Sequence, residues 1–379
     1  MVQSACVVDA AAGDNEKDGT RSDDPALKTV PTYAIDTSRS PLERVDLKAY
    51  GLGADGAGVD VYKVALAAKL GDLYIGLDSA CCDAVPGNGG LRVRQYRKPR
   101  DAVMDVVQLT RTMSMKHNMF NTGFAGAKLV VAAADAPECL DKRALMREVA
   151  RSLALMRGRV YTGCDLNTSS DDMVYLDAIS PYVLSGITNA TLDTNVATAM
   201  GTFAAIVELA EHLQLADGFC VLVQGAGKVG ATLASRLVAH GCRVRVTDLD
   251  PSRADIAGCE NVSAAPTEWF RDAHMDVFAP CAASGVIDER VAQELAPQCR
   301  AIVGSANVPF RTPQAAELCA ARGVVFVPES ITSAGAIIID SVEWCLDKCS
   351  FAALRPNIAY HFVQNQIAAK TREFCQRSV

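Results

Sequence analysis

The segment from Val221 to Asp248 constrains the fold of this chain more than any other part of the sequence. A short apolar run leads into glycines spaced G-x-G-x-x-G, at Gly225, Gly227 and Gly230, and an amphipathic stretch follows them. A second run, with apolar residues at alternate positions, ends at Asp248. A strand, a glycine turn, a helix and a second strand in this order predict a βαβ unit of a doubly wound parallel sheet.

Each part of this segment has a physical role in binding a dinucleotide. Gly225 permits a tight turn, Gly227 lets a pyrophosphate approach the backbone, and Gly230 lets the helix pack closely on the strand. The carboxylate of Asp248 accepts hydrogen bonds from ribose hydroxyls and would repel a 2′-phosphate, so the predicted cofactor is NAD. The residues expected around the cofactor here are Gly225, Ala226, Gly227, Lys228, Val229, Gly230 and Asp248.

Composition excludes several other classes of protein. The chain has 379 residues, half of them apolar, and a net charge of −7, which gives no reason to expect nucleic acid or an anionic membrane as a partner. We find no run of about 20 apolar residues and no signal peptide. The 14 cysteines include no C-x-x-C pair, and several lie in apolar stretches, so we expect no metal site and a reducing, cytoplasmic compartment.

The distribution of patterns along the chain predicts an α/β protein with two domains. Residues 1–30 are rich in Asp, Gly, Ala and Ser and are expected to form a disordered tail. Mixed strand and helix patterns over 31–185 predict an N-terminal α/β domain. Strands alternating with helices over 186–345 predict a Rossmann domain with a doubly wound parallel sheet. We expect the helix at 346–379 to pack back on the first domain.

Several motifs in order along the chain resemble those of the Glu/Leu/Phe/Val (amino acid) dehydrogenase family, and most of all its phenylalanine and leucine dehydrogenases. The likeness covers roughly 73–343. The matching segments are Gly89-Gly90-Leu91-Arg92, Met115-Lys116, Lys128, Tyr161 to Thr168, Thr198 to Gly201, Asp276 to Ala282, and Gly304 to Asn307. The resemblance implies NAD-dependent oxidative deamination of an L-amino acid to its 2-oxo acid and ammonia, and self-association through the first domain.

The resemblance also implies roles for individual residues. Lys116 would bind the substrate carboxylate, helped by Asn307 and the backbone around Gly90. Lys128 would be the general base, because a buried ammonium near another cation loses its proton more readily. Asp165 would pass protons to and from the substrate nitrogen.

Other implied roles concern the cofactor and the substrate side chain. Thr198 would contact the nicotinamide amide, and Cys281 and Ala282 would lie in a cofactor loop. Gly163 and Ile337 would line a pocket for a large apolar or aromatic side chain. Each has a structural alternative: Thr198 as a helix cap, and Asn307 and Gly163 as turn residues.

Departures from the family pattern leave two other functions open. Ala125-Gly126-Ala127 stands before Lys128 where the family usually has three glycines, Val308 follows Asn307 where a second asparagine is common, and Ser333 replaces another asparagine. These changes are compatible with a relative that couples an imine to a second amine. The third possibility is a nucleotide-binding scaffold without turnover, which retention of Lys116, Lys128 and Asp165 disfavours.

Overall fold

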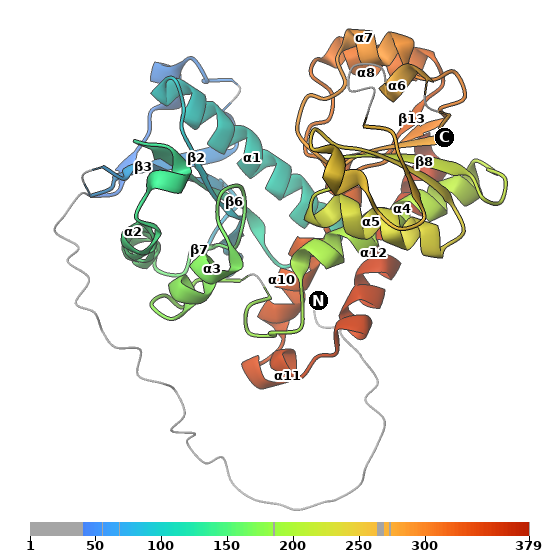
Figure 1. Cartoon of the computed structure of the whole chain (residues 1–379). Helices are drawn as coiled ribbons and strands as arrows, with labels where there is room; N and C mark the ends of the chain where they lie inside the picture. The colour runs from blue at the N-terminus through green and yellow to red at the C-terminus, as the bar shows by residue number, and fades with distance from the viewer. Residues whose placement is uncertain are drawn as a thin grey trace, which may run out of the picture. The chain divides into compact units, whose positions relative to one another are not determined.

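The computed structural model describes residues 41–54, 56–67, 69–184, 186–263, 269–272 and 274–378, and the predicted tail at 1–30 lies outside them. The described residues belong to one compact unit. They form two β-sheets, each with helices of its own (Figure 1). This mixed α/β architecture with a Rossmann-type sheet confirms the predicted fold class.

The first sheet is seven-stranded and mixed in strand direction. In spatial order it contains β1 (Glu43–Arg44), β2 (Val59–Ala65), β3 (Gly71–Asp78), β6 (Ala125–Ala133), β4 (Gly87–Asn88) and β7 (Val160–Tyr161), with β5 (Leu91–Arg94) also paired to β6. The helices of this part are α1 (Pro99–Phe120), α2 (Lys142–Leu155) and α3 (Ser170–Asp177). Successive β6 side chains pack on opposite faces, Leu129 with the α2 residue Leu145 and Val130 with the α1 residue Val106.

The second sheet is parallel throughout, in the order β10-β9-β8-β11-β12-β13. Its strands are β8 (Cys220–Gln224), β9 (Arg243–Thr247), β10 (Cys259–Asn261), β11 (Val277–Pro280), β12 (Ala301–Ile302) and β13 (Val325–Phe326). The strand order reverses between β8 and β11. A doubly wound sheet binds its ligand at such a reversal, beyond the carboxyl ends of the strands.

Helices cover both faces of this sheet (Figure 1). Val221 and Val223 pack against one group of helices and Leu222 packs against the other, as alternation along a strand requires. The first group is α4 (Thr194–His212), α5 (Lys228–Ala239), α9 (Glu329–Thr332), α10 (Gly335–Cys345), α11 (Lys348–Ala352) and α12 (Pro356–Ser378). The second group is α6 (Trp269–Asp272), α7 (Glu289–Glu294) and α8 (Pro313–Ala321).

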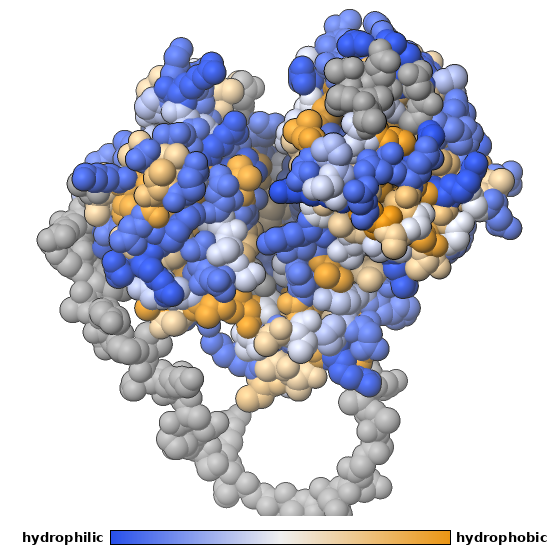
Figure 2. Space-filling model, viewed as in Figure 1, coloured by the Kyte–Doolittle hydropathy of each residue, from blue (hydrophilic) through white to orange (hydrophobic). Residues whose placement is uncertain are grey.

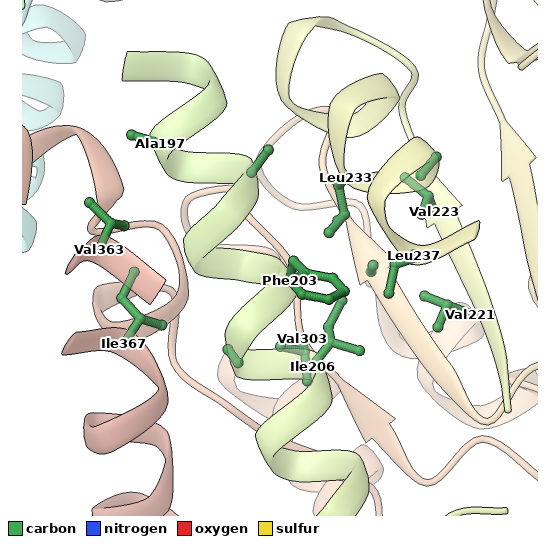
Figure 3. Packing of buried hydrophobic residues seen from close by; sticks show 14 of the residues in the cluster. Ala197, Phe203, Ile206, Val221, Val223, Leu233, Leu237, Val303, Val363 and Ile367 are labelled. Carbon is green, nitrogen blue, oxygen red and sulfur yellow. The ribbon is translucent and has the colours of Figure 1, made fainter. Parts of the chain in front are cut away.

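The C-terminal helix corrects one prediction. Instead of packing back on the first domain, α12 lies along α4, and its Val363 and Ile367 join the core that contains Phe203 (Figure 3). Gly201 permits this close approach, because a Cβ at that position would lie 2.2 Å from Ile367 Cδ1. The sequence of a helix does not by itself specify which surface the helix packs against.

Polar side chains dominate the face of the molecule in view, with apolar residues in small scattered patches (Figure 2). Within the described ranges, no helix combines the length and apolar character needed to cross a membrane.

Candidate active site

Lys128 and Asp165 meet as an ion pair beside the first sheet. Lys128 lies on β6, Asp165 follows β7, and Lys128 Nζ is 2.7 Å from Asp165 Oδ2. Arg92, just after the Gly89-Gly90 pair, places its Nε 3.0 Å from the same oxygen. Burial alone would raise the pKa of Asp165, but Lys128 and Arg92 hold that pKa below its ordinary value. The carboxylate is therefore kept ionised in a mostly buried position.

Arg92 also links this pair to a second acid. Its guanidinium lies 3.1 Å from Asp105 Oδ2 on α1, and the Tyr96 hydroxyl donates to the same carboxylate. Thr168 Oγ1 accepts a hydrogen bond from the Asp165 backbone N–H at 2.9 Å. These contacts fix the orientation of Asp165. The prediction of catalytic residues omitted Arg92, although it was quoted as the basic residue that follows the glycine pair.

The Lys116 side chain extends from α1 to Asn307, in the loop after β12, and to Ser333, directly after α9. Its Nζ donates to Ser333 Oγ at 2.8 Å and to Asn307 Oδ1 at 3.3 Å. The residue is 6% exposed, and burial lowers the pKa of its ammonium to about 8, with Lys128 acting in the same direction. Lys116, which the sequence predicts to bind the substrate carboxylate, is thus a buried cation with a lowered pKa. Ser333, noted only as a departure from the family pattern, is a direct partner of Lys116.

The loop between β4 and β5 closely approaches Lys128 and Asp165. A Cβ on Gly90 would lie 2.7 Å from the Cys164 carbonyl oxygen, 2.9 Å from Asp165 Cβ and 3.3 Å from Lys128 Nζ, so a side chain there would displace the ion pair.

Before Lys128, Gly126 faces α1, where a Cβ would be 2.3 Å from Ser114 N. The methyl groups of Ala125 and Ala127 instead belong to a buried apolar cluster. The two alanines therefore leave the substrate side of β6 unchanged.

Asn307 is held by an unusual backbone conformation at the next residue. Val308 adopts φ 47°, a left-handed conformation that a β-branched residue rarely takes. Its N–H donates to Glu329 Oε1 at 3.1 Å, and Glu329 in turn favours the charged form of Lys116. This conformation of Val308 accompanies the contact between the Asn307 amide and Lys116.

A cavity of about 280 Å³ brings most of these side chains together. Its lining includes the predicted site residues Gly90, Lys116, Lys128, Gly163, Asp165, Thr198, Val229, Asn307 and Ile337. It also includes residues that the sequence analysis did not assign: Asn88, Met113, Cys164, Leu184, Thr194, Ser305, Ser333, Ala336 and Asp340. Residues from both sheets therefore share one cavity.

The remaining predicted residues lie at the carboxyl ends of β8, β9 and β11. Gly225 adopts φ 99°, and a Cβ there would lie 2.6 Å from the Cβ of Ala282. A Cβ on Gly230 would lie 1.8 Å from the Gly225 carbonyl oxygen and 3.3 Å from Cys281 Cβ. Gly227 caps α5 without a side-chain hydrogen bond, and its missing Cβ faces open space. This turn fits a pyrophosphate, because the first N–H groups of α5, from Lys228 and Val229, can point at an anion.

Asp248 directly follows β9 and lies beside the glycine turn. Its Oδ2 accepts the Ala226 N–H at 2.7 Å, and its Oδ1 accepts the Asp250 N–H at 3.0 Å. Each oxygen keeps a further lone pair for a ribose hydroxyl.

On α4, Thr198 donates to the Thr194 carbonyl at 2.9 Å, which leaves the lone pairs of its hydroxyl for an amide donor. Thr198 lies within α4, so its alternative role as a helix cap is wrong, since Asp193 caps that helix.

Burial raises the pKa of the Cys281 thiol, so this cysteine is a packed thiol and not an activated nucleophile. Within the described segments, no group of three or more His, Cys, Asp or Glu side chains could hold a metal ion.

The chain is similar in sequence to known proteins. Residues 245–376 match the family model described as Glutamate/Leucine/Phenylalanine/Valine dehydrogenase. A phenylalanine dehydrogenase of Thermoactinomyces intermedius is 30% identical over 264 residues, which cover 67% of this chain and 71% of the relative.

Solved structures show the same fold. L-tryptophan dehydrogenase from Nostoc punctiforme is similar with a TM-score of 0.63 and 26% identity, over 80% of this chain and 85% of that one. A hetero-hexameric glutamate dehydrogenase from Thermus thermophilus is similar with a TM-score of 0.67 and 19% identity, over 88% and 89%. Fold, site and relatives together define an amino acid dehydrogenase, an oxidoreductase acting on a CH–NH₂ donor with a nicotinamide cofactor. The chain belongs to the Glu/Leu/Phe/Val dehydrogenase family.

Proposed function

We propose that this protein catalyses the NAD-dependent oxidative deamination of an L-amino acid to its 2-oxo acid and ammonia, and the reverse reductive amination. The observation that carries the proposal is the meeting of Lys116, Lys128 and Asp165 in one cavity with Thr198 and Val229. Val229 is the second residue of the helix that follows the glycine turn, so the cavity reaches the start of that helix. Phenylalanine and tryptophan dehydrogenases among the relatives support the same reaction.

The chain's own residues bind and orient the amino acid. The Lys116 ammonium pairs with the substrate carboxylate, and Ser333 and Asn307 hold Lys116 in place. The crevice around Gly225, Gly227 and Asp248 would hold the cofactor, and Thr198 would bind its amide. When bound, the cofactor would supply an acceptor for the hydride of the substrate α-carbon. Lys116, by fixing the substrate carboxylate, would orient that α-carbon in the cavity.

The ion pair of Lys128 and Asp165 handles protons. Asp165 accepts a proton from the substrate ammonium, which leaves the nitrogen lone pair able to form the imine as the hydride departs. Lys128, once it has released its own proton to solvent, takes a proton from the water that attacks the imine carbon. Asp165 returns a proton to the nitrogen, and the leaving ammonia carries away the hydroxyl proton as ammonium while the carbonyl forms. Hydride and proton together account for the two electrons and two hydrogens removed from the amino acid.

We also propose that the substrate carries a large side chain. Gly163, which has no side chain, lines the cavity together with the apolar residues Met113, Leu184 and Ile337. This lining supports the predicted preference for large apolar or aromatic side chains.

Two further parts of the proposal concern the assembled protein. We propose a homo-oligomer, supported by the family resemblance, and light scattering in solution tests it, with a monomer as the contrary result. We propose a reducing, cytoplasmic compartment, supported by buried thiols such as Cys220, Cys242 and Cys299, which form no disulfide. Fractionation of the source cells tests the proposed compartment.

The central experiment follows the nicotinamide absorbance with NAD and a panel of L-amino acids, and assays ammonia in parallel. The proposal predicts one ammonia released for each NADH formed. Oxidation of NADH with a 2-oxo acid only in the presence of a second amine would instead show a coupling enzyme. Cofactor binding without turnover of any amino acid would show a scaffold and contradict the proposal.

A further inference from the structure

An acid lines the wall of the active-site cavity where the sequence analysis expects an apolar pocket. Asp340 lies on α10, one turn after the predicted pocket residue Ile337, and both line the cavity with Gly163. Its side chain is buried, with 8% of the residue exposed. Its Oδ2 accepts a hydrogen bond from Asn88 Nδ2 at 3.2 Å, and Asn88 lines the same cavity. The pocket therefore contains two adjoining polar groups.

Asn88 is held rigidly in this position. It lies on β4, which is paired on both sides, with β6 and with β7. Its backbone carbonyl accepts a hydrogen bond from His117 Nε2 at 3.1 Å, while His117 Nδ1 accepts one from Thr122 Oγ1 at 2.7 Å. Because its amide N–H group is directed at Asp340, the orientation of the carboxyl group is fixed as well.

Asp340 has no cationic partner in the described part of the chain. No described lysine, arginine or histidine forms an ion pair with it, and its charged neighbour is Glu343, an acid one turn further along α10. Burial, and then Glu343, raise the pKa of Asp340 to about 8. A buried carboxyl group with one amide donor keeps unsatisfied acceptor capacity, and such capacity is costly unless a ligand meets it.

We propose that Asp340 and Asn88 form the polar end of the side-chain pocket and select an amino acid whose side chain ends in a hydrogen-bond-donating nitrogen. This inference rests on the proposed function and specifies its substrate. An ammonium group would supply the missing counter-ion of Asp340, and an indole N–H would supply a single donor.

Matched substrate pairs test the proposal in the unaltered protein with NAD. Ornithine and norleucine have the same length and differ in whether an ammonium or a methyl group ends the chain. Tryptophan and 3-benzothienylalanine have the same shape and differ in the N–H group. We expect kcat/KM to favour the nitrogen-bearing member of at least one pair by about tenfold or more, because a site built around a polar contact rejects the analogue that lacks it. Preference in the first pair identifies a basic substrate, and preference in the second an aromatic one.

Two variants assign the preference to Asp340. Asp340→Leu should abolish it in either pair. Asp340→Asn removes the charge but keeps an acceptor, so it should abolish preference for ornithine and retain part of a preference for tryptophan. Asp217→Asn removes an exposed acid in a turn and is the matched control, which should leave both ratios unchanged. Melting temperatures with NAD bound show whether each variant is folded.

The outcomes separate the two levels of the proposal. If kcat/KM is the same for norleucine as for ornithine, and the same for 3-benzothienylalanine as for tryptophan, the inference is wrong and Asp340 is a protonated structural residue. The dehydrogenase function would still stand. A preference that survives Asp340→Leu also contradicts the role of Asp340. If no amino acid reduces NAD, the proposed function fails and this inference fails with it.

Discussion

Lys128 Nζ lies 2.7 Å from Asp165 Oδ2, although one residue is within β6 and the other follows β7. The contact forms because β4 lies between β6 and β7 and runs parallel to both. The glycine pair after β4 leaves space over which the two side chains meet, and Arg92 holds the far side of the carboxylate. Lys128 and Asp165 therefore form one ion pair that acts as a unit.

Replacing Lys128 should remove turnover without unfolding the protein. We expect Lys128→Ala to lower kcat at least about a hundredfold, since general base catalysis contributes on that scale, with NAD affinity and melting temperature nearly unchanged. Lys370→Ala, which breaks a surface pair with Glu373, is the control. Because the pair acts as a unit, Asp165→Asn added to Lys128→Ala should cost little more. A variant that keeps over about a tenth of the rate would show that Lys128 is not the base.

Cofactor titrations should show tighter binding of NAD than of NADP. The Asp248 carboxylate accepts N–H groups from Ala226 and Asp250, so it is held where a 2′-phosphate would meet like charge. Asp248→Asn should narrow the difference in Kd between the two cofactors. Arg253 pairs with Asp250 at 3.5 Å, and Arg253→Ala should leave the difference in place. Equal affinities in the unaltered protein would contradict the role of Asp248.

Binding of the substrate carboxylate should depend on the protonation of Lys116. Its lowered pKa of about 8 means that the free ammonium loses its proton above that pH. A competitive inhibitor with a carboxylate and no amine should therefore bind progressively more weakly as pH rises above about 8. In Lys116→Ala, binding should be weak and independent of pH in this range. Affinity that stays constant from pH 7 to 9.5 in the unaltered protein would show that Lys116 does not hold the carboxylate.

His117 should make the protein less stable in mild acid. Burial lowers its pKa to about 4 from an ordinary value near 6.5, so the unfolded chain binds the proton first as pH falls. The folded state loses stability between these two values, by about 2 kcal/mol between pH 7.5 and pH 5. Urea unfolding at both values measures the loss. His117→Gln should reduce the difference between the two pH values, and an unchanged difference would show that another group is responsible.

Substitution of Val308 should increase stability. A β-branched residue at φ 47° costs about 1 kcal/mol relative to glycine, and the hydrogen bond from its backbone N–H to Glu329 does not need the side chain. We expect Val308→Gly to raise the free energy of unfolding by about that amount. Val303→Gly, in the buried core beside the same loop, should destabilise instead. A loss of stability in Val308→Gly would show that the side chain contributes more by packing than the backbone conformation costs.

Local pattern determined the Rossmann sheet and the nucleotide crevice. The glycines at 225, 227 and 230, the strand before them and Asp248 lie within one βαβ unit, so their spacing along the chain fixes their arrangement in space. The same holds for the start of α8 at Thr312 and Pro313, where an N-cap and a fixed φ act on neighbouring residues. The two lysines and Asp165 were found through the family's motifs.

Only the tertiary structure decided which distant residues face one another. Ser333 reaches Lys116, Asn88 reaches Asp340, and α12 packs along α4. In each case the partners lie far apart in sequence. The polar residues could equally lie on a solvated surface, and the helix could equally pack against another core. A side chain's chemistry states what contact it needs, whereas the packing of the two sheets and their helices decides which partner supplies that contact. That is why the sequence predicted the reaction, and why the polar wall of the pocket became visible only in the folded chain.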